Sequence, residues 1–216
     1  DLIAGNWGMN NQIKADDKHP AQLVFKDFDG NGSVDPILGH TIQGKLYPSY
    51  SLDELLNQLP GQKKRFPNYE SYSNVDFEAL LAGDFAKGAT KLPVNRFETT
   101  LFINDGAGKF SYAQLPLEAQ FSPVYAIAVS DVNQDGRADL ILAGNQSTTR
   151  ISMGKMDANY GMLFLGKGDG KFEYVPQYKS GLRIAGDVKD LFLLPDGRLF
   201  AARNNAGVVV YELKGR

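Results

Sequence analysis

The sequence predicts an all-β fold built from repeated units of short antiparallel strands. Two observations lead to this prediction: an acidic nine-residue pattern occurs twice between β-rich segments, and a glycine-turn hairpin pattern also occurs twice. Self-similar units of about 50 residues are typical of repeat folds, including propellers. The acidic pattern covers Asp27–Asp35 and Asp131–Asp139, and the hairpin pattern covers Leu101–Tyr112 and Leu163–Tyr174.

Each acidic segment has oxygen-bearing side chains at its positions 1, 3, 5 and 9 and a glycine at position 6. Calcium takes about six to eight oxygen ligands, which a chain supplies by curling around the ion with alternate side chains inward. Gly32 and Gly136 stand at the sharp bend, where a positive φ is favourable only without a Cβ. We therefore expect two Ca²⁺ sites. Main-chain carbonyls would come from Ser33 and Arg137, and side-chain ligands from Asp27, Asp29, Asn31, Asp35, Asp131, Asn133, Asp135 and Asp139.

The main alternative to a strand-flanked calcium loop is an EF-hand. That loop ends in a bidentate Glu at position 12 and lies between two helices, whereas position 12 here is Leu38 or Leu142. The flanking residues are short β-rich runs, which predict strands on both sides of each loop. A second alternative is that Asp, Asn and Gly simply form good turns without a metal, although the same ligand spacing occurs twice. The expected strands include Leu23–Phe25, Val34–Leu38, Ala126–Val129 and Ala138–Gly144.

Joined in order, one repeat reads strand, acidic loop, strand and glycine-turn hairpin, and it covers Ser122–Pro176. An earlier copy, Ala21–Pro116, is stretched by an insertion, and a last copy, Val188–Leu213, keeps three strands and only a tight turn in place of the loop. Four short antiparallel strands per unit are typical of a propeller blade. We therefore expect one β-propeller-like domain over residues 1–216, with about four blades or as part of a larger ring.

The first residues also match the repeat. Asp1–Asn6 reads DLIAGN and Asp139–Asn145 reads DLILAGN, so Asp1 falls on position 9 of an acidic loop whose earlier residues would lie upstream. We therefore expect the chain to be part of a longer polypeptide.

The insertion, about residues 44–98, differs from the rest of the chain in its predicted helices and its many aromatic residues. Ser51 followed by Glu54 has the capping-box spacing, which predicts a helix of two to three turns, and a second helical stretch is expected over Val75–Leu81. Aromatic residues are densest here, and exposed aromatic rings can stack on sugars or on partner proteins. Whether these rings form a small core or a ligand platform is left open by the sequence; the candidates are Tyr47, Tyr50, Tyr69 and Tyr72.

The composition restricts the classes of function. With 43% apolar and 22% charged residues, the 216-residue chain has ordinary globular composition. A net charge of -2 provides no basic footprint for nucleic acid. There is no cysteine, which excludes disulfides and thiolate metal sites. No apolar run approaches the roughly 18 residues of a membrane span.

The loop Asp131–Asn145 followed by Leu163–Phe172 resembles the FG-GAP or VCBS repeats of integrin α-subunit propellers and of large bacterial surface proteins. With Gly5–Asn11 and the helical insertion, nearly the whole chain is similar to the C-terminal propeller portion of Bacteroidetes-type VCBS-repeat proteins. This resemblance implies that calcium braces each blade through a hairpin loop, which gives the eight side-chain ligands a structural role. It also implies an extracellular, cell-surface or periplasmic location.

Motifs for catalysis are missing from the sequence. There is no GxSxG elbow, HExxH helix or Walker lysine motif, and the two histidines, His19 and His40, are expected at the surface. We therefore expect a non-catalytic calcium-binding module that serves in recognition of an unknown protein or glycan, or as a scaffold. The alternative is a fragment of a polysaccharide lyase or glycosidase with its active site on the propeller face.

Overall fold

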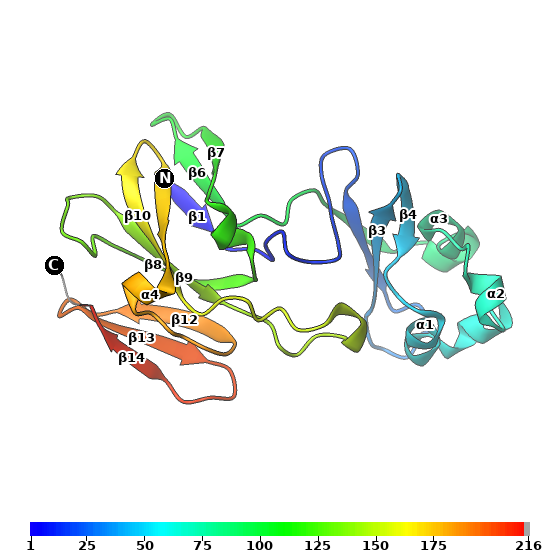
Figure 1. Ribbon diagram of the computed structural model, residues 1–216. Coiled ribbons are helices and arrows are strands. Elements are labelled where there is room, and N and C mark those ends of the chain that lie inside the picture. Colours follow the sequence, from blue (N-terminus) through cyan, green and yellow to red (C-terminus); the bar gives the residue numbers. More distant parts are fainter. Residues whose placement is uncertain (214–216) are drawn as a thin grey trace. The chain divides into compact units, whose positions relative to one another are not determined.

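The computed structural model describes residues 1–213, whose strands form four antiparallel sheets and whose helices are few and short (Figure 1). The chain divides into two compact units. We call residues 13–96 the central unit, and residues 1–12 with the described residues from 97 onward the terminal unit. Each unit has its own buried apolar clusters.

The terminal unit contains three of the four sheets. The first joins a strand from the start of the chain to a later hairpin, because Leu2 pairs with Phe102. The second is an up-and-down sheet in the order β11-β10-β9-β8, and the third has the order β12-β13-β14. The strands are β1 (Leu2–Ala4), β6 (Thr100–Asn104), β7 (Phe110–Gln114), β8 (Val124–Ser130), β9 (Asp139–Gly144), β10 (Met162–Gly168), β11 (Lys171–Val175), β12 (Val188–Leu193), β13 (Arg198–Arg203) and β14 (Val209–Glu212). Short helical turns are η3 (Leu117–Gln120), η4 (Ile151–Met153) and α4 (Gln177–Ser180).

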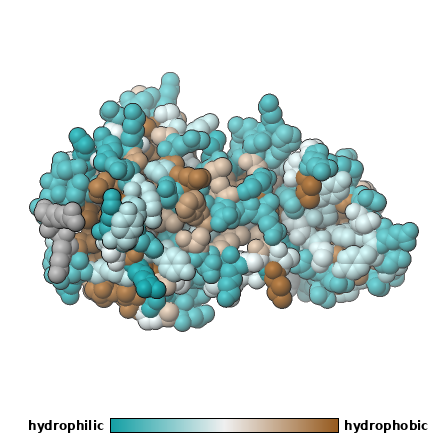
Figure 2. Space-filling view, viewed as in Figure 1, coloured by the Kyte–Doolittle hydropathy of each residue, from teal (hydrophilic) through white to brown (hydrophobic). Residues whose placement is uncertain are grey.

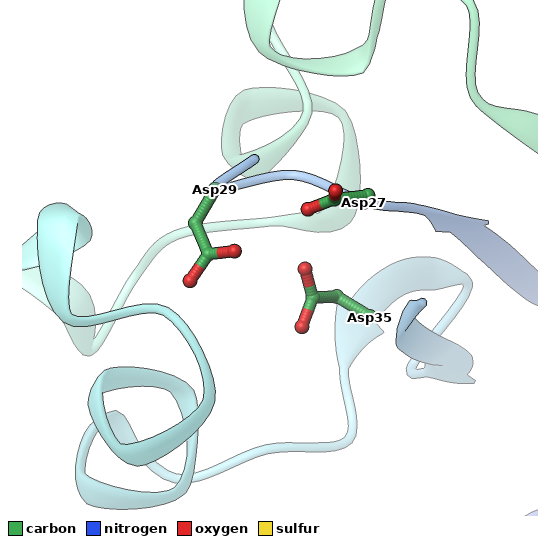
Figure 3. Close-up of side chains that lie close together, drawn as sticks. All are labelled: Asp27, Asp29 and Asp35. Atoms are coloured by element: carbon green, nitrogen blue, oxygen red, sulfur yellow. The ribbon is translucent and has the colours of Figure 1, made fainter. Parts of the chain in front are cut away.

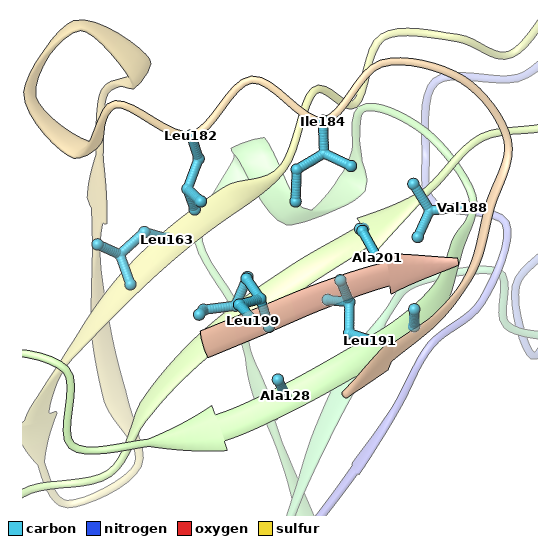
Figure 4. Close-up of a cluster of buried hydrophobic side chains, with 11 residues drawn as sticks. Ala128, Leu163, Leu182, Ile184, Val188, Leu191, Leu199 and Ala201 are labelled. Carbon is cyan, nitrogen blue, oxygen red and sulfur yellow. The ribbon is translucent and has the colours of Figure 1, made fainter. Parts of the chain in front are cut away.

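Strand β9 is buried at all of its positions because it has apolar neighbours on both faces. Ile141 and Ala143 belong to a cluster that includes Leu191 and Leu199 of β12 and β13 (Figure 4). Leu140 and Leu142 belong to the opposite cluster, with Leu101 of β6. Since side chains alternate between the faces of a strand, the continuous apolar run of β9 is what a sheet covered on both faces requires.

The central unit is a four-stranded sheet, order β4-β3-β2-β5, with helices packed against it. Helix α1 begins after Ser51, whose hydroxyl accepts the Glu54 N–H while the Glu54 carboxylate accepts the Ser51 N–H. Gly39 allows α3 to approach the sheet, because a Cβ there would lie 2.6 Å from the Phe77 ring. The elements are β2 (Ala21–Lys26), β3 (Asp35–Ile42), β4 (Lys45–Pro48), α1 (Leu52–Gln58), η1 (Pro60–Lys64), α2 (Tyr69–Tyr72), α3 (Phe77–Leu80), η2 (Gly83–Ala86) and β5 (Thr90–Val94).

The structure confirms the predicted secondary structure at most positions. Strands flank both acidic segments, which excludes the EF-hand alternative. Both glycine-turn hairpins and the three strands of the last copy are present. The capped helix after Ser51 is present, and the second helical stretch is limited to Phe77–Leu80. The protein is therefore rich in antiparallel β-structure; none of the sheets within residues 1–213 closes on itself, and closure into a propeller stays a prediction.

The molecular surface seen in Figure 2 is mostly hydrophilic, with its apolar residues in separate small patches. Among the described residues, no helix has both the length and the apolar character that crossing a bilayer would require.

Candidate metal site

Three carboxylates of the first acidic loop converge on one point in the central unit (Figure 3). Asp27 directly follows β2, Asp35 opens β3, and Asp29 lies in the turn between them. Each offers an oxygen, and these oxygens lie within 4.8 Å of one another. Asp35 is buried, whereas Asp29 is exposed, so the group has access to solvent. This arrangement gives the loop the oxygen donors of a metal-ion site.

Hydrogen bonds from the loop's own backbone orient these carboxylates. Asp27 Oδ1 accepts the N–H groups of Gly30 (2.7 Å) and Asn31 (3.0 Å), and its Oδ2 accepts the N–H of Gly32 (2.8 Å). Asp35 Oδ2 accepts the Phe28 N–H at 2.9 Å. The hydrogen bonds to Asp27, above all that from Gly32, lower the pKa of this carboxyl below its ordinary value. Asp27 is therefore held as a carboxylate.

The second acidic loop, in the terminal unit, is tied together by the same hydrogen bonds. Asp131 accepts from the N–H groups of Asp135 (3.0 Å) and Gly136 (2.8 Å), as Asp27 does from Asn31 and Gly32. Asp139 Oδ2 accepts the Val132 N–H at 2.8 Å, as Asp35 does that of Phe28. The bonds from position 5 to the side chain at position 3, and from position 7 to that at position 5, are also shared. The two loops thus share one local conformation.

Backbone angles agree with this equivalence. Gly32 and Gly136, at position 6, have φ of +88° and +83°. Position 4 is also left-handed in both loops, at Gly30 with φ +77° and at Gln134 with φ +58°. Because an L-residue other than Gly is strained in this region, the glycine predicted to be necessary at position 6 has a direct structural reason.

The second loop differs from the first in how its carboxylates are placed. The group within 4.8 Å formed by the first loop has no counterpart in the second loop or elsewhere in residues 1–213. Asn133 Nδ2 instead donates to Asp135 Oδ2 at 3.1 Å. Asp139 is fully buried, and its Oδ1 accepts the Gly166 N–H of β10 at 2.8 Å. The second loop is therefore fastened to the neighbouring strand, and its metal ligation stays a prediction, as do the carbonyl ligands of Ser33 and Arg137.

Aromatic packing holds the first loop against the rest of the central unit. Phe28, at position 2, stacks on Phe85 of η2 with ring centroids 4.5 Å apart. Lys26 Nζ lies 5.2 Å from the centre of the Phe28 ring and donates to the Lys87 carbonyl at 3.0 Å. These contacts are not predictable from the sequence, because the apolar character of Phe28 does not identify a partner some 57 residues later.

The predicted ligand-binding tyrosines separate into two groups. Tyr47, Tyr50 and Tyr72 line one groove in the central unit. Tyr69 does not line it; its hydroxyl donates to Asp53 Oδ2 at 2.8 Å. Tyr72 is mostly buried, which raises the pKa of its phenol to about 12. Gln43 and Lys45 line the same groove from the β3–β4 turn, although no sequence pattern had predicted a binding role for them.

Both histidines have polar neighbours. His19 Nδ1 lies 3.3 Å from Asp16 Oδ1, on an exposed stretch before β2. His40 Nδ1 lies 2.6 Å from Ser49 Oγ, in a half-buried pair between β3 and the residue after β4. Comparison of the chain with models of known protein families, with curated proteins and with solved structures found no match.

Proposed function

We propose that this protein is a calcium-binding β-repeat module of the FG-GAP or VCBS type, belonging to an exported or cell-surface protein. In this proposal the ion stabilises a strand–loop–strand unit, and the module serves in recognition or as a scaffold rather than in catalysis. The observation that carries it is the convergence of the Asp27, Asp29 and Asp35 carboxylates within 4.8 Å.

The donor set favours calcium over other metals. Oxygens bound to one Ca²⁺ at about 2.3–2.6 Å lie at most about 5 Å apart, which agrees with the observed spread of 4.8 Å. Zinc sites in proteins are dominated by Cys and His, which this loop lacks. Calcium also tolerates variable ligand numbers, whereas Mg²⁺ requires near-ideal octahedral geometry.

Electrostatics give the ion a stabilising role. Carboxylates that share a small volume repel one another unless a cation neutralises them. An ion that binds only the folded state increases the free energy of unfolding by RT ln(1 + [L]/Kd). The five hydrogen bonds that the two loops share support a second, weaker calcium site in the Asp131–Asp139 loop. Calcium is abundant outside cells, so an extracellular module that binds the ion with modest affinity can still be occupied.

The test is calorimetric titration of Ca²⁺ into the chelator-treated protein, together with thermal melts. We expect binding heat, a higher melting temperature in calcium than in chelator, and weaker binding of Mg²⁺. Asp29→Ala removes one ligand of the first site and is expected to weaken binding there by at least about tenfold. Asp84→Ala, also exposed and in the same unit, is the matched control and is expected to bind like the wild type. Absence of heat together with identical melts in calcium and chelator would refute the proposal.

A further inference from the structure

A groove of about 530 Å³ opens beside the β3–β4 hairpin, and none of its lining residues belongs to the acidic loop. Its walls include Tyr47, Tyr50 and Tyr72, together with Gln43, Lys45 and Ser73. Its volume lies within the roughly 300–1,000 Å³ of small-molecule sites. The lining comes from two short segments, residues 42–50 and 72–75, so the site is compact and does not form an extended channel.

The walls of the groove are held in place by hydrogen bonds and by a tight turn. Tyr72 donates its hydroxyl to the Tyr50 carbonyl, and Tyr50 donates its own to the Pro36 carbonyl, both at 3.0 Å. The two-residue turn has Gln43 at φ +50° and Gly44 at φ +80°, the left-handed pair typical of a type I′ hairpin. This turn sets Gln43 at the rim and brings Lys45 opposite Ile42. A ligand would therefore meet a largely preformed surface, which reduces the entropic cost of binding.

The groove has no net charge. Lys45 Nζ lies 2.8 Å from Asp76 Oδ2, so the one ammonium that lines the groove is paired with a carboxylate. A neutral ligand is therefore favoured over an anion or a cation. Within residues 1–213, the Tyr47 hydroxyl and the Gln43 side-chain amide make no hydrogen bond, which leaves donors and acceptors beside the half-buried Tyr47 ring. Lys45 Nζ lies over this ring, 5.7 Å from its centre, so a sugar would stack on the face away from the ammonium.

We propose that this groove binds a neutral saccharide, with the apolar C–H face of one pyranose ring against Tyr47 and ring hydroxyls bonded to the Gln43 amide and the Tyr47 phenol. Tyrosine suits this role because it offers a rigid amphipathic surface at low entropic cost. Proline-rich peptides also dock on aromatic grooves, but they lie along an extended surface, whereas this site is short. The inference goes beyond the proposed calcium function and does not depend on it.

The test is calorimetric titration of the full chain with five probes: the hexasaccharides of β-1,4-glucose, β-1,4-mannose, β-1,4-xylose and β-1,4-N-acetylglucosamine, and hexagalacturonate as the acidic control. We expect at least one neutral probe to bind and the acidic one not to. Tyr47→Ala is expected to weaken that binding by about tenfold or more. Gln43→Asn, which keeps a residue tolerant of the left-handed turn but shortens the amide, is expected to weaken it less.

Tyr69→Ala is the matched control, because Tyr69 is an exposed tyrosine of the same unit that does not line the groove. It is expected to bind the saccharide like the wild type, and circular dichroism confirms folding of each variant. The proposal is overturned if no neutral probe binds, if Tyr47→Ala binds as well as Tyr69→Ala, or if a polyproline peptide binds at Tyr47 and the saccharides do not. Each titration is run in calcium and in chelator, so that loss of the metal is distinguished from loss of the groove.

Discussion

Asp27 and Asp131 each use one carboxylate to accept several backbone N–H groups of a tight turn. These hydrogen bonds have two effects in the first loop. The N–H groups of the turn, which cannot take part in strand pairing, gain hydrogen-bond acceptors. The carboxylate is kept charged and is oriented toward the inside of the loop. A single residue therefore both shapes the loop and prepares it to receive a cation.

At the residue scale, the lowered pKa of Asp27 predicts a pH dependence of stability. A carboxyl whose pKa is depressed on folding contributes stability above its ordinary value, 3.8, and this contribution is lost as the pH falls through the lower folded value. Between about pH 5 and pH 2.5, in chelator, the free energy of unfolding of the wild type should therefore fall more steeply than that of Asp27→Asn. Urea unfolding at a series of pH values measures both slopes. Asp84→Asn serves as control, and parallel curves for wild type and Asp27→Asn would contradict the prediction.

The spacing of oxygen-bearing residues predicted the approach of the three carboxylates of the first loop, whereas ligation by the Asn31 side chain at position 5 stays a prediction. Positions 1, 3 and 9 converge as expected because the glycine at position 6 permits the bend. The same spacing did not predict that Asn133 would bond to Asp135, since side-chain rotamers depend on the neighbours that the tertiary fold supplies. The separation of Tyr69 from the other three tyrosines has the same cause. The sequence shows that aromatic residues are dense in this segment, but it does not show which way each side chain points.

At the scale of elements, Asp139 couples two strands through one side chain. It opens β9, closes its own loop through the Val132 N–H, and accepts the N–H of Gly166 in β10. Gly166 in turn has to lack a side chain, because a Cβ there would lie 2.3 Å from the Ala138 carbonyl oxygen. Asp139 thus links the acidic loop to strand β10 through hydrogen bonds.

This coupling predicts a large cost for losing the Asp139 carboxylate. Asp139→Ala leaves the half-buried Val132 N–H and the buried Gly166 N–H without their acceptor, and an unsatisfied buried group costs about 1–3 kcal/mol. We expect the free energy of unfolding to fall by about 2–4 kcal/mol in urea titrations, in chelator as well as in calcium. Asp157→Ala, an exposed aspartate in the same unit, should change it by less than about 0.5 kcal/mol. A similarly small change in the free energy of unfolding for both variants would show that these hydrogen bonds do not contribute to stability.

Elements with a strong local pattern were predictable from the sequence, whereas some of their partners were not. The capping box before α1 and the glycine-turn hairpins are set by neighbouring residues, so their signals are complete within a short window. The pairing of β1 with β6 joins residues about 100 positions apart. No short window contains both strands, and the match of Asp1–Asn6 to the repeat indicated a strand without indicating its neighbour.

At the scale of the whole molecule, the chain has two compact units with separate apolar clusters. Leu80 and Phe77 lie in the cluster of the central unit, and Ile141 and Phe164 lie in those of the terminal unit. The only tryptophan, Trp7, stacks on Phe97 at 5.7 Å within the terminal unit. Trp7 fluorescence therefore serves as a probe of the terminal unit.

Separate clusters predict separate responses to a core substitution. Leu80 is fully buried, and Leu80→Ala is expected to destabilise the central unit by about 2–5 kcal/mol. In urea, the transition followed by far-UV circular dichroism should begin earlier, while the Trp7 fluorescence transition stays in place. Ile141→Ala is the counterpart and should move the Trp7 transition. If Leu80→Ala shifts both signals together, the two units unfold as one cooperative structure.

The pairing of β1 with β6 also constrains the order of events on the ribosome. All four strands of the central sheet lie within residues 21–94, so that sheet has every strand before β6 is made. Leu2–Ala4 is made before this sheet, and its hydrogen-bonding partner within residues 1–213, Thr100–Asn104, is made only after it. At about 5–20 residues per second, roughly 5–20 s separate the synthesis of β1 from that of β6. The pairing of β1 with β6 can therefore form only after all four strands of the central sheet have been made.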